Sequence, residues 1–132
     1  MRYSGAEGAV AAFAKKRGIP MSESIAGKGA VCHDEPVYVG AMGIEGSEAA
    51  RKLSESADVV IAIGTRMQDF TTGSWTTFPK DAKFININAA RFDSLKHRAT
   101  PVVGDALECV TELDASLGDW TAPAARLVQA QA

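Results

Sequence analysis

Residues 64–73 form a glycine- and threonine-rich segment that carries one arginine and directly follows a strongly apolar run. The backbone amides of such a loop and the side chain of Arg66 are groups that bind phosphates and other anions. The apolar run, Val59–Ile63, shows no alternation with polar residues, which is typical of a parallel strand covered on both faces. Because open α/β sheets bind ligands at the carboxyl ends of their strands, we expect Gly64 and Arg66 to lie at a binding crevice.

A second segment, Cys32-His33-Asp34-Glu35, combines side chains that can bind metals or act as nucleophiles. Four consecutive residues cannot all converge on one point, and useful ligand spacings leave gaps, so we expect a polar loop and no metal site. Cys109 lies far away and forms no Cys-x-x-Cys pair with Cys32. This cysteine usage favours a reduced, intracellular protein without disulfides.

Two glycine-rich segments precede helices or loops that could meet an anion. Gly27-Lys28-Gly29 is no phosphate-binding P-loop, because the serine or threonine after the lysine is absent, and we expect this loop to face a neighbouring domain. Gly40, Gly43 and Gly46 lead to a helix start at Ser47. That start could bind an anion, or the glycines could form a tight turn that lets the helix pack closely, and both interpretations stay open.

The remaining polar and aromatic clusters are expected to lie at the surface. His97 is surrounded in sequence by Lys96, Arg98 and Arg91, a pattern more typical of a solvated face than of an anion site. Three aromatic residues are expected to be exposed in this chain and to cover seams between domains in a longer one: Trp75, Phe78 and Trp120.

Helix signals occur at three places. Ser4 with Glu7 predicts a capping box for a helix ending at Gly18, Ser47 predicts the start of a helix, and Asp105 with Glu108 predicts another capping box. Strands are predicted at 19–22, 59–63, 83–88 and 101–103, the segment 30–46 is predicted to be irregular, and 121–132 is predicted to be a tail or linker.

This alternation of helices and strands predicts an α/β fold, a three-layer doubly wound parallel sheet of Rossmann-like type. Such a sheet usually begins with a strand, whereas this chain begins with a helix, so we expect the first strand to be missing. Loss of a central strand leaves two unpaired edges. We therefore expect the isolated chain to dimerise or to be poorly stable.

Composition excludes several classes of partner. The chain has 132 residues, 46% hydrophobic and 23% charged, with a formal net charge of −2, which favours neither nucleic acid nor an anionic membrane. The N-terminus lacks the apolar stretch of a signal peptide, and no apolar run reaches the length of a membrane span. We expect a cytoplasmic protein.

Several motifs together resemble the middle domain of thiamine diphosphate-dependent enzymes over residues 1–120. They are Tyr3-Ser4-Gly5-Ala6, Gly27-Lys28-Gly29-Ala30, Ala57-Asp58 with the strand to Gly64-Thr65-Arg66, Thr72-Gly73, and Val103-Gly104-Asp105. Residues 66–75 and 84–88 resemble most the trihydroxycyclohexanedione hydrolases of myo-inositol catabolism, relatives of which have also been labelled malonic semialdehyde oxidative decarboxylase. The resemblance implies a larger enzyme that hydrolyses a carbon–carbon bond of a cyclic 1,2-dione.

The resemblance also implies where the cofactor lies. In these enzymes the first domain binds the pyrimidine of thiamine diphosphate and the third binds its diphosphate with Mg²⁺; the motifs of both are absent from this chain. We therefore expect no catalytic residue and no metal ligand here, a mainly structural role, and partners in the N- and C-terminal domains of the parent chain. Full-length relatives are expected to be homo-oligomers.

Relatives within the superfamily use the crevice of the middle domain differently: acetohydroxyacid synthases hold FAD there, and some decarboxylases hold adenine nucleotides. By resemblance, Gly64, Arg66, Asn88 and Asp105 are the candidate nucleotide contacts. Asn86 and Asn88 stand where the synthases carry aspartates that grip a ribose, which argues against tight binding. The alternative function is therefore an FAD- or ADP-binding module.

Two residues of the arginine-bearing loop are candidates for the substrate side of the domain, Asp69 and Phe70. The synthases carry an arginine at the place of Phe70, where it suits a carboxylate-bearing substrate. Here an aromatic ring would instead lie against a polyhydroxylated ring.

Overall fold

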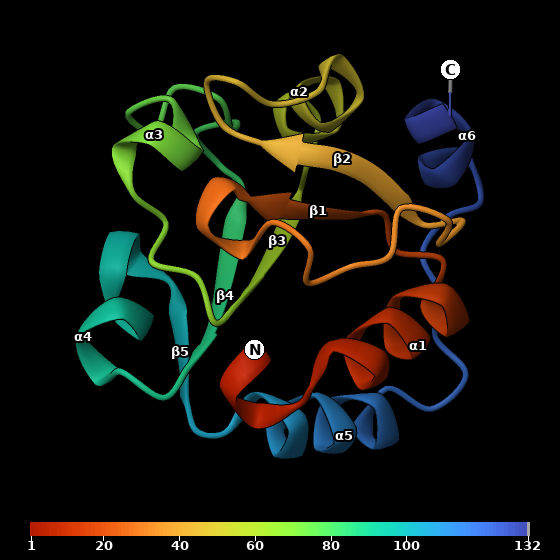
Figure 1. Ribbon diagram of the computed structural model, residues 1–132, viewed down its shortest axis with the longest axis vertical. Coiled ribbons are helices and arrows are strands. Elements are labelled where there is room, and N and C mark those ends of the chain that lie inside the picture. The colour runs from red at the N-terminus through yellow and green to blue at the C-terminus, as the bar shows by residue number, and fades with distance from the viewer. Residues whose placement is uncertain (132) are drawn as a thin grey trace.

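The computed structural model describes residues 1–131, and the side chains of residues 1–129, as two small parallel sheets surrounded by helices (Figure 1). The strands are β1 (Met21–Ser24), β2 (Tyr38–Met42), β3 (Val59–Ile63), β4 (Lys83–Asn88) and β5 (Thr100–Val103). The α-helices are α1 (Glu7–Arg17), α2 (Glu48–Glu55), α3 (Asp69–Thr72), α4 (Arg91–Ser94), α5 (Ala106–Ser116) and α6 (Ala125–Gln131). Short 3-10 turns lie at η1 (Arg2–Ser4), η2 (Ile25–Gly27) and η3 (Lys96–Arg98).

All strand pairs are parallel, which confirms the predicted α/β class. The strands divide into a sheet of order β1-β2 and a sheet of order β3-β4-β5. This division makes β3 an edge strand, although its apolar sequence predicted cover on both faces. Val59 is 47% exposed, and within β3 only Ala62 is fully buried. The predicted burial of β3 was therefore wrong for this chain.

Helices α1 and α5 lie side by side against one face of the larger sheet (Figure 1). Their apolar faces and β4 form the main core cluster of Ala6, Val10, Phe13, Ile87, Ala106 and Val110. A second cluster on the opposite face contains Ala62, Met67 and Phe78, with Trp75 and Phe84 packed against it. Phe78 is thus buried and Trp75 half-buried, so their predicted exposure was wrong, whereas Trp120 is exposed as predicted.

Three of the four predicted helix ends are confirmed, at Gly18, Ser47 and Asp105. Gly18 ends α1 in the left-handed conformation, with φ of 66°. The Ser47 hydroxyl accepts from the amide of Ala50 at 3.1 Å and caps α2. The capping box of Ser4 and Glu7 is wrong: Ser4 belongs to η1, and Ala6 is the N-cap residue of α1.

Two strand predictions also need correction. β1 begins two residues later than predicted, and β2 lies inside the segment that was predicted to be irregular. β2 is short and contains Gly40 at a φ of 96°, which obscures any strand pattern in the sequence. No helix among the described residues is long and apolar enough to cross a bilayer.

The C-terminal segment contains a helix, α6, within the predicted tail. Arg126 of α6 donates to the backbone oxygen of Ser56 at 2.8 Å and lies 3.3 Å from Asp58. The amide of Ala122 donates to the oxygen of Arg17 at 2.7 Å. These contacts fold the segment back on the body of the domain.

Arg17, at the end of α1, holds α1, α5 and the following turn together. Its side chain is 2% exposed, and its Nε donates to Asp114 Oδ1 at 2.6 Å. Its Nη1 donates to the backbone oxygens of Gly118 and Trp120 at 2.6 and 2.7 Å, and its Nη2 donates to that of Asp114 at 2.6 Å. A planar group with five donors suits these closely placed acceptors, so each guanidinium nitrogen of Arg17 is paired despite its burial.

The small sheet is fixed by a buried carboxylate on β1, Glu23. Its Oε1 accepts from the Tyr38 hydroxyl at 2.7 Å and lies 3.1 Å from Lys28 Nζ. Its Oε2 accepts from the amides of Gly29 and Ala30 at 2.9 and 3.2 Å. Burial raises the pKa of Glu23, but the bonds from Tyr38 and Lys28 outweigh it and leave the pKa below its usual value.

Replacing Arg17 by alanine is expected to lower the free energy of unfolding by about 3 kcal/mol, because the substitution removes the buried donor from Asp114 and from three backbone carbonyls. The matched control is Lys16→Ala, which removes an exposed ion pair to the same carboxylate. This variant is expected to change the free energy of unfolding by less than about 1 kcal/mol. Urea denaturation measures both values. Equal losses for the two variants would contradict the role assigned to Arg17.

Replacing Glu23 by glutamine is expected to destabilise the chain by about 2 kcal/mol at neutral pH. Because the folded-state pKa of Glu23 is lowered, its contribution is fully present above the unfolded pKa and is lost as pH falls through the folded pKa. The original chain and Glu23→Gln should therefore differ in unfolding free energy at pH 7, and this difference should shrink at pH 3. The exposed Glu45→Gln is the control. A constant difference across this range would refute the assignment.

Candidate functional site

The carboxyl ends of β3, β4 and β5 meet at one edge of the larger sheet. Because the strands are parallel, the residues that follow them come together: the amide of Gly64 donates to Ile87 at 2.8 Å. The amide of Gly104 donates to the backbone oxygen of Asn88 at 3.3 Å. The predicted crevice residues Gly64, Asn88 and Asp105 thus lie at or just after the ends of three strands tied by backbone bonds.

Asn88 is occupied by bonds inside the chain. Its Nδ2 donates to the backbone oxygen of Thr65 at 3.1 Å, and its Oδ1 accepts from the amide of Ala90 at 2.9 Å. The side chain therefore clamps the loop after β3 to the turn after β4. One N–H of the amide is left for any ligand.

Asp105 is the N-cap residue of α5. Its Oδ1 accepts from the amides of Leu107 and Glu108 at 2.8 and 3.4 Å, as its capping role predicted. A hydrogen bond from Ser4 is the largest cause that holds the pKa of Asp105 below its usual value. The positive end of α5 is thus filled by the chain's own carboxylate, the position that a ligand phosphate would otherwise take.

Gly64 lies against the first residue of the chain. It has a φ of 63°, and a Cβ atom at this position would lie 2.4 Å from the amino nitrogen of Met1. Only glycine fits such an approach without strain. Met1 therefore occupies the space beside the carboxyl end of β3.

Arg66 points away from this group of residues. Its side chain is 73% exposed, and its Nε lies 3.9 Å from Asp93 Oδ2 on α4. Asp93 also pairs with Lys96 at 2.6 Å, and Lys96 lies 3.4 Å from the backbone oxygen of Arg66. The arginine is thus placed over α4 and shares its acidic partner with a second cation.

Asp69 and Phe70 lie on α3, which packs against the turn after β2. The backbone oxygen of Phe70 accepts from the amide of Ile44 at 3.1 Å. A Cβ atom at Gly43, whose φ is 118°, would lie 2.7 Å from the same oxygen. The Phe70 and Ile44 side chains are both exposed, 66% and 63%. We call these two exposed apolar residues, joined through this backbone hydrogen bond, the Ile44–Phe70 patch.

A cavity of about 420 Å³ lies at the opposite end of the sheet, beside the first residues of β4 and β5. Its lining includes Phe84, Arg98 and Trp75, whose ring stacks on His97 with 3.2 Å between the centroids. Burial is the largest cause that lowers the pKa of His97, with the charge of Lys96 second. None of the predicted crevice residues lines this cavity.

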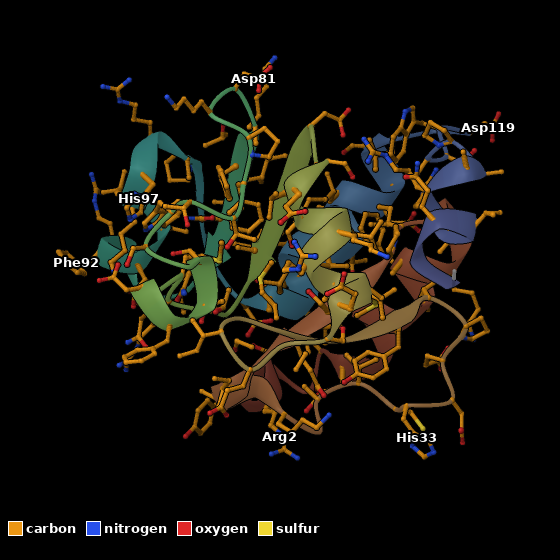
Figure 2. All side chains as sticks on the ribbon, turned by 90° about the horizontal axis from the view of Figure 1, so that it is seen from above. Arg2, His33, Asp81, Phe92, His97 and Asp119 are labelled. Carbon is orange, nitrogen blue, oxygen red and sulfur yellow. The ribbon has the colours of Figure 1, made fainter. Side chains whose placement is uncertain are left out.

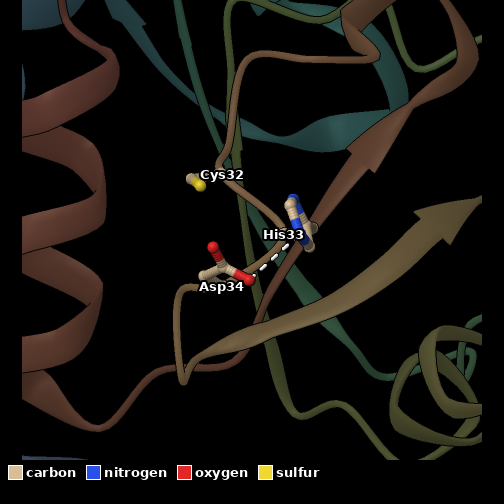
Figure 3. A group of neighbouring side chains, drawn as sticks. All are labelled: Cys32, His33 and Asp34. Atoms are coloured by element: carbon tan, nitrogen blue, oxygen red, sulfur yellow. Dashed lines mark ion pairs between the residues drawn. The ribbon is translucent and has the colours of Figure 1, made fainter.

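The ligand atoms of Cys32, His33 and Asp34 lie within 4.8 Å of one another (Figure 3). All three side chains are exposed on the loop before β2, where His33 Nε2 lies 3.0 Å from Asp34 Oδ1. Glu35 pairs with Lys15 at 2.8 Å, so the four residues do not all converge, whereas the other three do. These three are exposed and have no buried partners, and a polar surface loop stays the expectation.

Sequence reasoning missed the two buried charges, Arg17 and Glu23. Each pairs with residues distant in the chain, such as Asp114 for Arg17, and no local pattern reveals such pairs. Asn86, on the buried face of β4, was predicted only to stand in place of a ribose-binding aspartate of the synthases. Its Nδ2 lies 3.5 Å from the oxygen of Asp93, and its Oδ1 has no partner among the described protein atoms.

Comparison with known proteins places this geometry in a family. The sequence profile of the thiamine pyrophosphate enzyme central domain matches residues 1–113. A 3D-(3,5/4)-trihydroxycyclohexane-1,2-dione hydrolase of Clostridium perfringens is 40% identical over 118 residues, 89% of this chain and 18% of the relative. Proteins with the same name from Listeria monocytogenes and Geobacillus thermodenitrificans are 46% identical over 112 residues and 38% identical over 120 residues.

These matches cover 85% and 91% of this chain and 18% and 19% of the relatives, so the chain spans about a fifth of the length of the proteins that it resembles. The expected resemblance is confirmed, and so is the expectation of a larger, multi-domain parent. The chain belongs to the family of thiamine pyrophosphate enzyme central domains.

Proposed function

We propose that this chain is the central domain of a thiamine diphosphate-dependent hydrolase that opens a cyclic 1,2-dione. The observation that carries the proposal is the identity of 38–46% to proteins named trihydroxycyclohexane-1,2-dione hydrolase, across most of this chain. When bound in the parent enzyme, thiamine diphosphate supplies the carbanion stabilisation that carbon–carbon cleavage beside a carbonyl needs.

The role of this domain in the parent is architectural. The polar side chains at the carboxyl edge are used inside the chain: Asn88 clamps two loops, Asp105 caps α5 and Arg66 pairs with Asp93. Among the described residues, the one group in which a thiol lies near an imidazole, Cys32 and His33, is exposed on the loop before β2 and away from this edge, and we assign it no catalytic role. The domain holds the other two in position, and its exposed loops form part of the wall around the substrate.

The residues at the crevice do not fit a tightly bound FAD or ADP. A diphosphate at the start of α5 would meet the Asp105 carboxylate, whose pKa is lowered and which is therefore charged at neutral pH. Neither Asn86 nor Asn88 offers the carboxylate that holds a ribose. The alternative, a nucleotide-binding module, is favoured by Gly64 and Arg66, which match nucleotide-contacting positions of the related synthases.

The other properties of the parent follow from the same proposal. The N- and C-terminal domains are the partners of this chain and bind the cofactor with Mg²⁺, and the parent is a cytoplasmic homo-oligomer. The Ile44–Phe70 patch supports contact with another domain or with substrate, because exposed apolar residues gather there beside the sheet edge.

Isothermal titration of this chain with FAD, ADP and thiamine diphosphate is expected to give no binding heat, and none of the three is expected to raise its melting temperature. The physical reason is the filled start of α5 and the absence of a ribose-binding carboxylate. Binding of FAD or ADP that is lost in Arg66→Ala would instead establish the nucleotide module. Binding of thiamine diphosphate would contradict the division of roles among the domains.

Replacing Phe70 by alanine in the full-length enzyme is expected to lower kcat/KM for the dione about tenfold, because an aromatic wall of the substrate site is lost. The matched control is Phe92→Ala on α4, where the side chain is 78% exposed and points away from the molecule (Figure 2). Steady-state kinetics of both variants measure the effect. An unchanged value for Phe70→Ala would remove this residue from the substrate side.

A further inference from the structure

The cavity beside the first residues of β4 and β5 is lined by cations and aromatic rings. Its cations are Lys80, in the loop before β4, Lys83, the first residue of β4, and Arg98 of η3. Among the described residues that line it, none is an aspartate or a glutamate. We call this cavity of about 420 Å³ the basic cavity, and it lies at the end of the sheet away from Gly64 and Asn88.

The cations of the basic cavity have no partner in the part of the chain that the structure describes. Ten of the 14 lysine and arginine residues lie within 4.0 Å of a carboxylate. The other four are Lys80, Lys83, Arg91 and Arg98, and their side chains make no hydrogen bond to a described residue either. Three of these four therefore line one cavity, where their like charges repel one another.

The acids closest to this cavity in sequence or in charge do not line it. Asp81 stands between the two lysines in sequence, but it lies at the outer edge of the molecule (Figure 2) and outside the lining. Burial and the charge of Lys96 lower the pKa of His97, and the charge of Asp69 raises it, yet Asp69 does not line the cavity either. The basic cavity thus presents an uncompensated positive surface, which attracts anions.

Two segments of the lining have backbone conformations that are unfavourable for residues with a Cβ atom. Trp75, His97 and Arg98 have φ of 65°, 55° and 58°. Only two other non-glycine residues in the described chain have a positive φ, Met67 and Ser74, and Ser74 directly precedes Trp75. Three of the five such residues therefore line this one cavity. Backbone strain of this kind concentrates at ligand clamps and other functional sites.

Aromatic rings form one wall of the basic cavity. The rings of Trp75 and Phe84 meet edge to face with 5.3 Å between their centroids, and those of Phe78 and Phe84 do so at 5.0 Å. Phe78 is buried, and the Trp75 ring stacks on His97. Such packed rings offer a rigid apolar surface, which suits a planar ring of a ligand better than a flexible chain.

We propose that the basic cavity binds a small planar molecule that carries two carboxylates. The cations come from three separate places in the chain, so they suit two separate negative charges. The Arg98 guanidinium pairs bidentately with one carboxylate, and Lys80 and Lys83 attract the second.

The lining favours carboxylates over phosphates. No glycine and no first residue of an α-helix is among the described residues that line the cavity, so the backbone-amide cradle typical of phosphate sites is missing. A cavity of this volume holds one ring with its substituents. The site does not depend on the hydrolase activity proposed above.

Isothermal titration of this chain with isophthalate, a benzene ring with two carboxylates, tests the proposal. Benzoate lacks one charge and glutarate lacks the ring, and each is expected to bind at least about fivefold more weakly than isophthalate. Arg98→Gln and Lys83→Gln are each expected to weaken isophthalate binding at least about fivefold. The matched control is Arg91→Gln, which removes the fourth unpaired cation, on α4 and outside the lining, and is expected to change the affinity less than about twofold.

The control variant and the full-length parent separate specific binding from the alternatives. No saturable binding up to about 10 mM, equal losses for Arg98→Gln and Arg91→Gln, or tighter binding of phenyl phosphate than of isophthalate overturns the proposal. Either lining variant decides if the other does not fold, and titration of the parent decides if this chain does not fold alone. Binding to this chain that is absent from the parent also overturns it, because other domains then fill the cavity.

Discussion

The hydrogen bonds of β3 are the constraint on which the rest of the structure depends. β4 satisfies one side of this strand, and on the other side the amides of Ile61 and Ile63 face no strand in the part of the chain that the structure describes. An apolar strand of this kind is built for the interior of a parallel sheet. The division into two sheets and the exposure of Val59 both put β3 at a sheet edge, while residues of both sheets pack against the core cluster of α1.

The edge of the larger sheet at which β3, β4 and β5 end explains why we assign a structural role to the domain. A doubly wound sheet gathers loops and helix starts there, and in this chain they bind one another: Asn88 clamps two loops, and Asp105 fills the start of α5. A site whose polar groups are paired internally is rigid and leaves few groups for ligands. Rigidity of this kind suits the structural role that we propose for this domain, which spans about a fifth of its relatives' length.

The sequence predicted those features that depend on a few neighbouring residues. The caps at Ser47 and Asp105 and the end of α1 at Gly18 were all predicted, because each rests on one side chain or one left-handed residue. Ser4 has the local pattern of a cap but interacts with Asp105 across the fold, so the local rule failed there. The placement of Gly64 beside Asn88 followed from the parallel strands.

Long-range pairs were beyond the reach of sequence reasoning. Glu23 accepts a hydrogen bond from Tyr38 on β2, a strand that the sequence did not predict because Gly40 interrupts its pattern. Arg17 donates to Asp114, which is 97 residues away in the chain. Phe78 was expected at the surface, yet the second core cluster buries it. Each of these contacts is decided by which elements pack together, and a sequence pattern describes one element at a time.

The most direct test of this account is amide exchange of β3, followed by NMR on this chain as a monomer. The account predicts that the amides of Ile61 and Ile63, which face away from β4, exchange at least about tenfold faster than those of Val60 and Ala62, which face β4. Equal exchange of the four amides would contradict it.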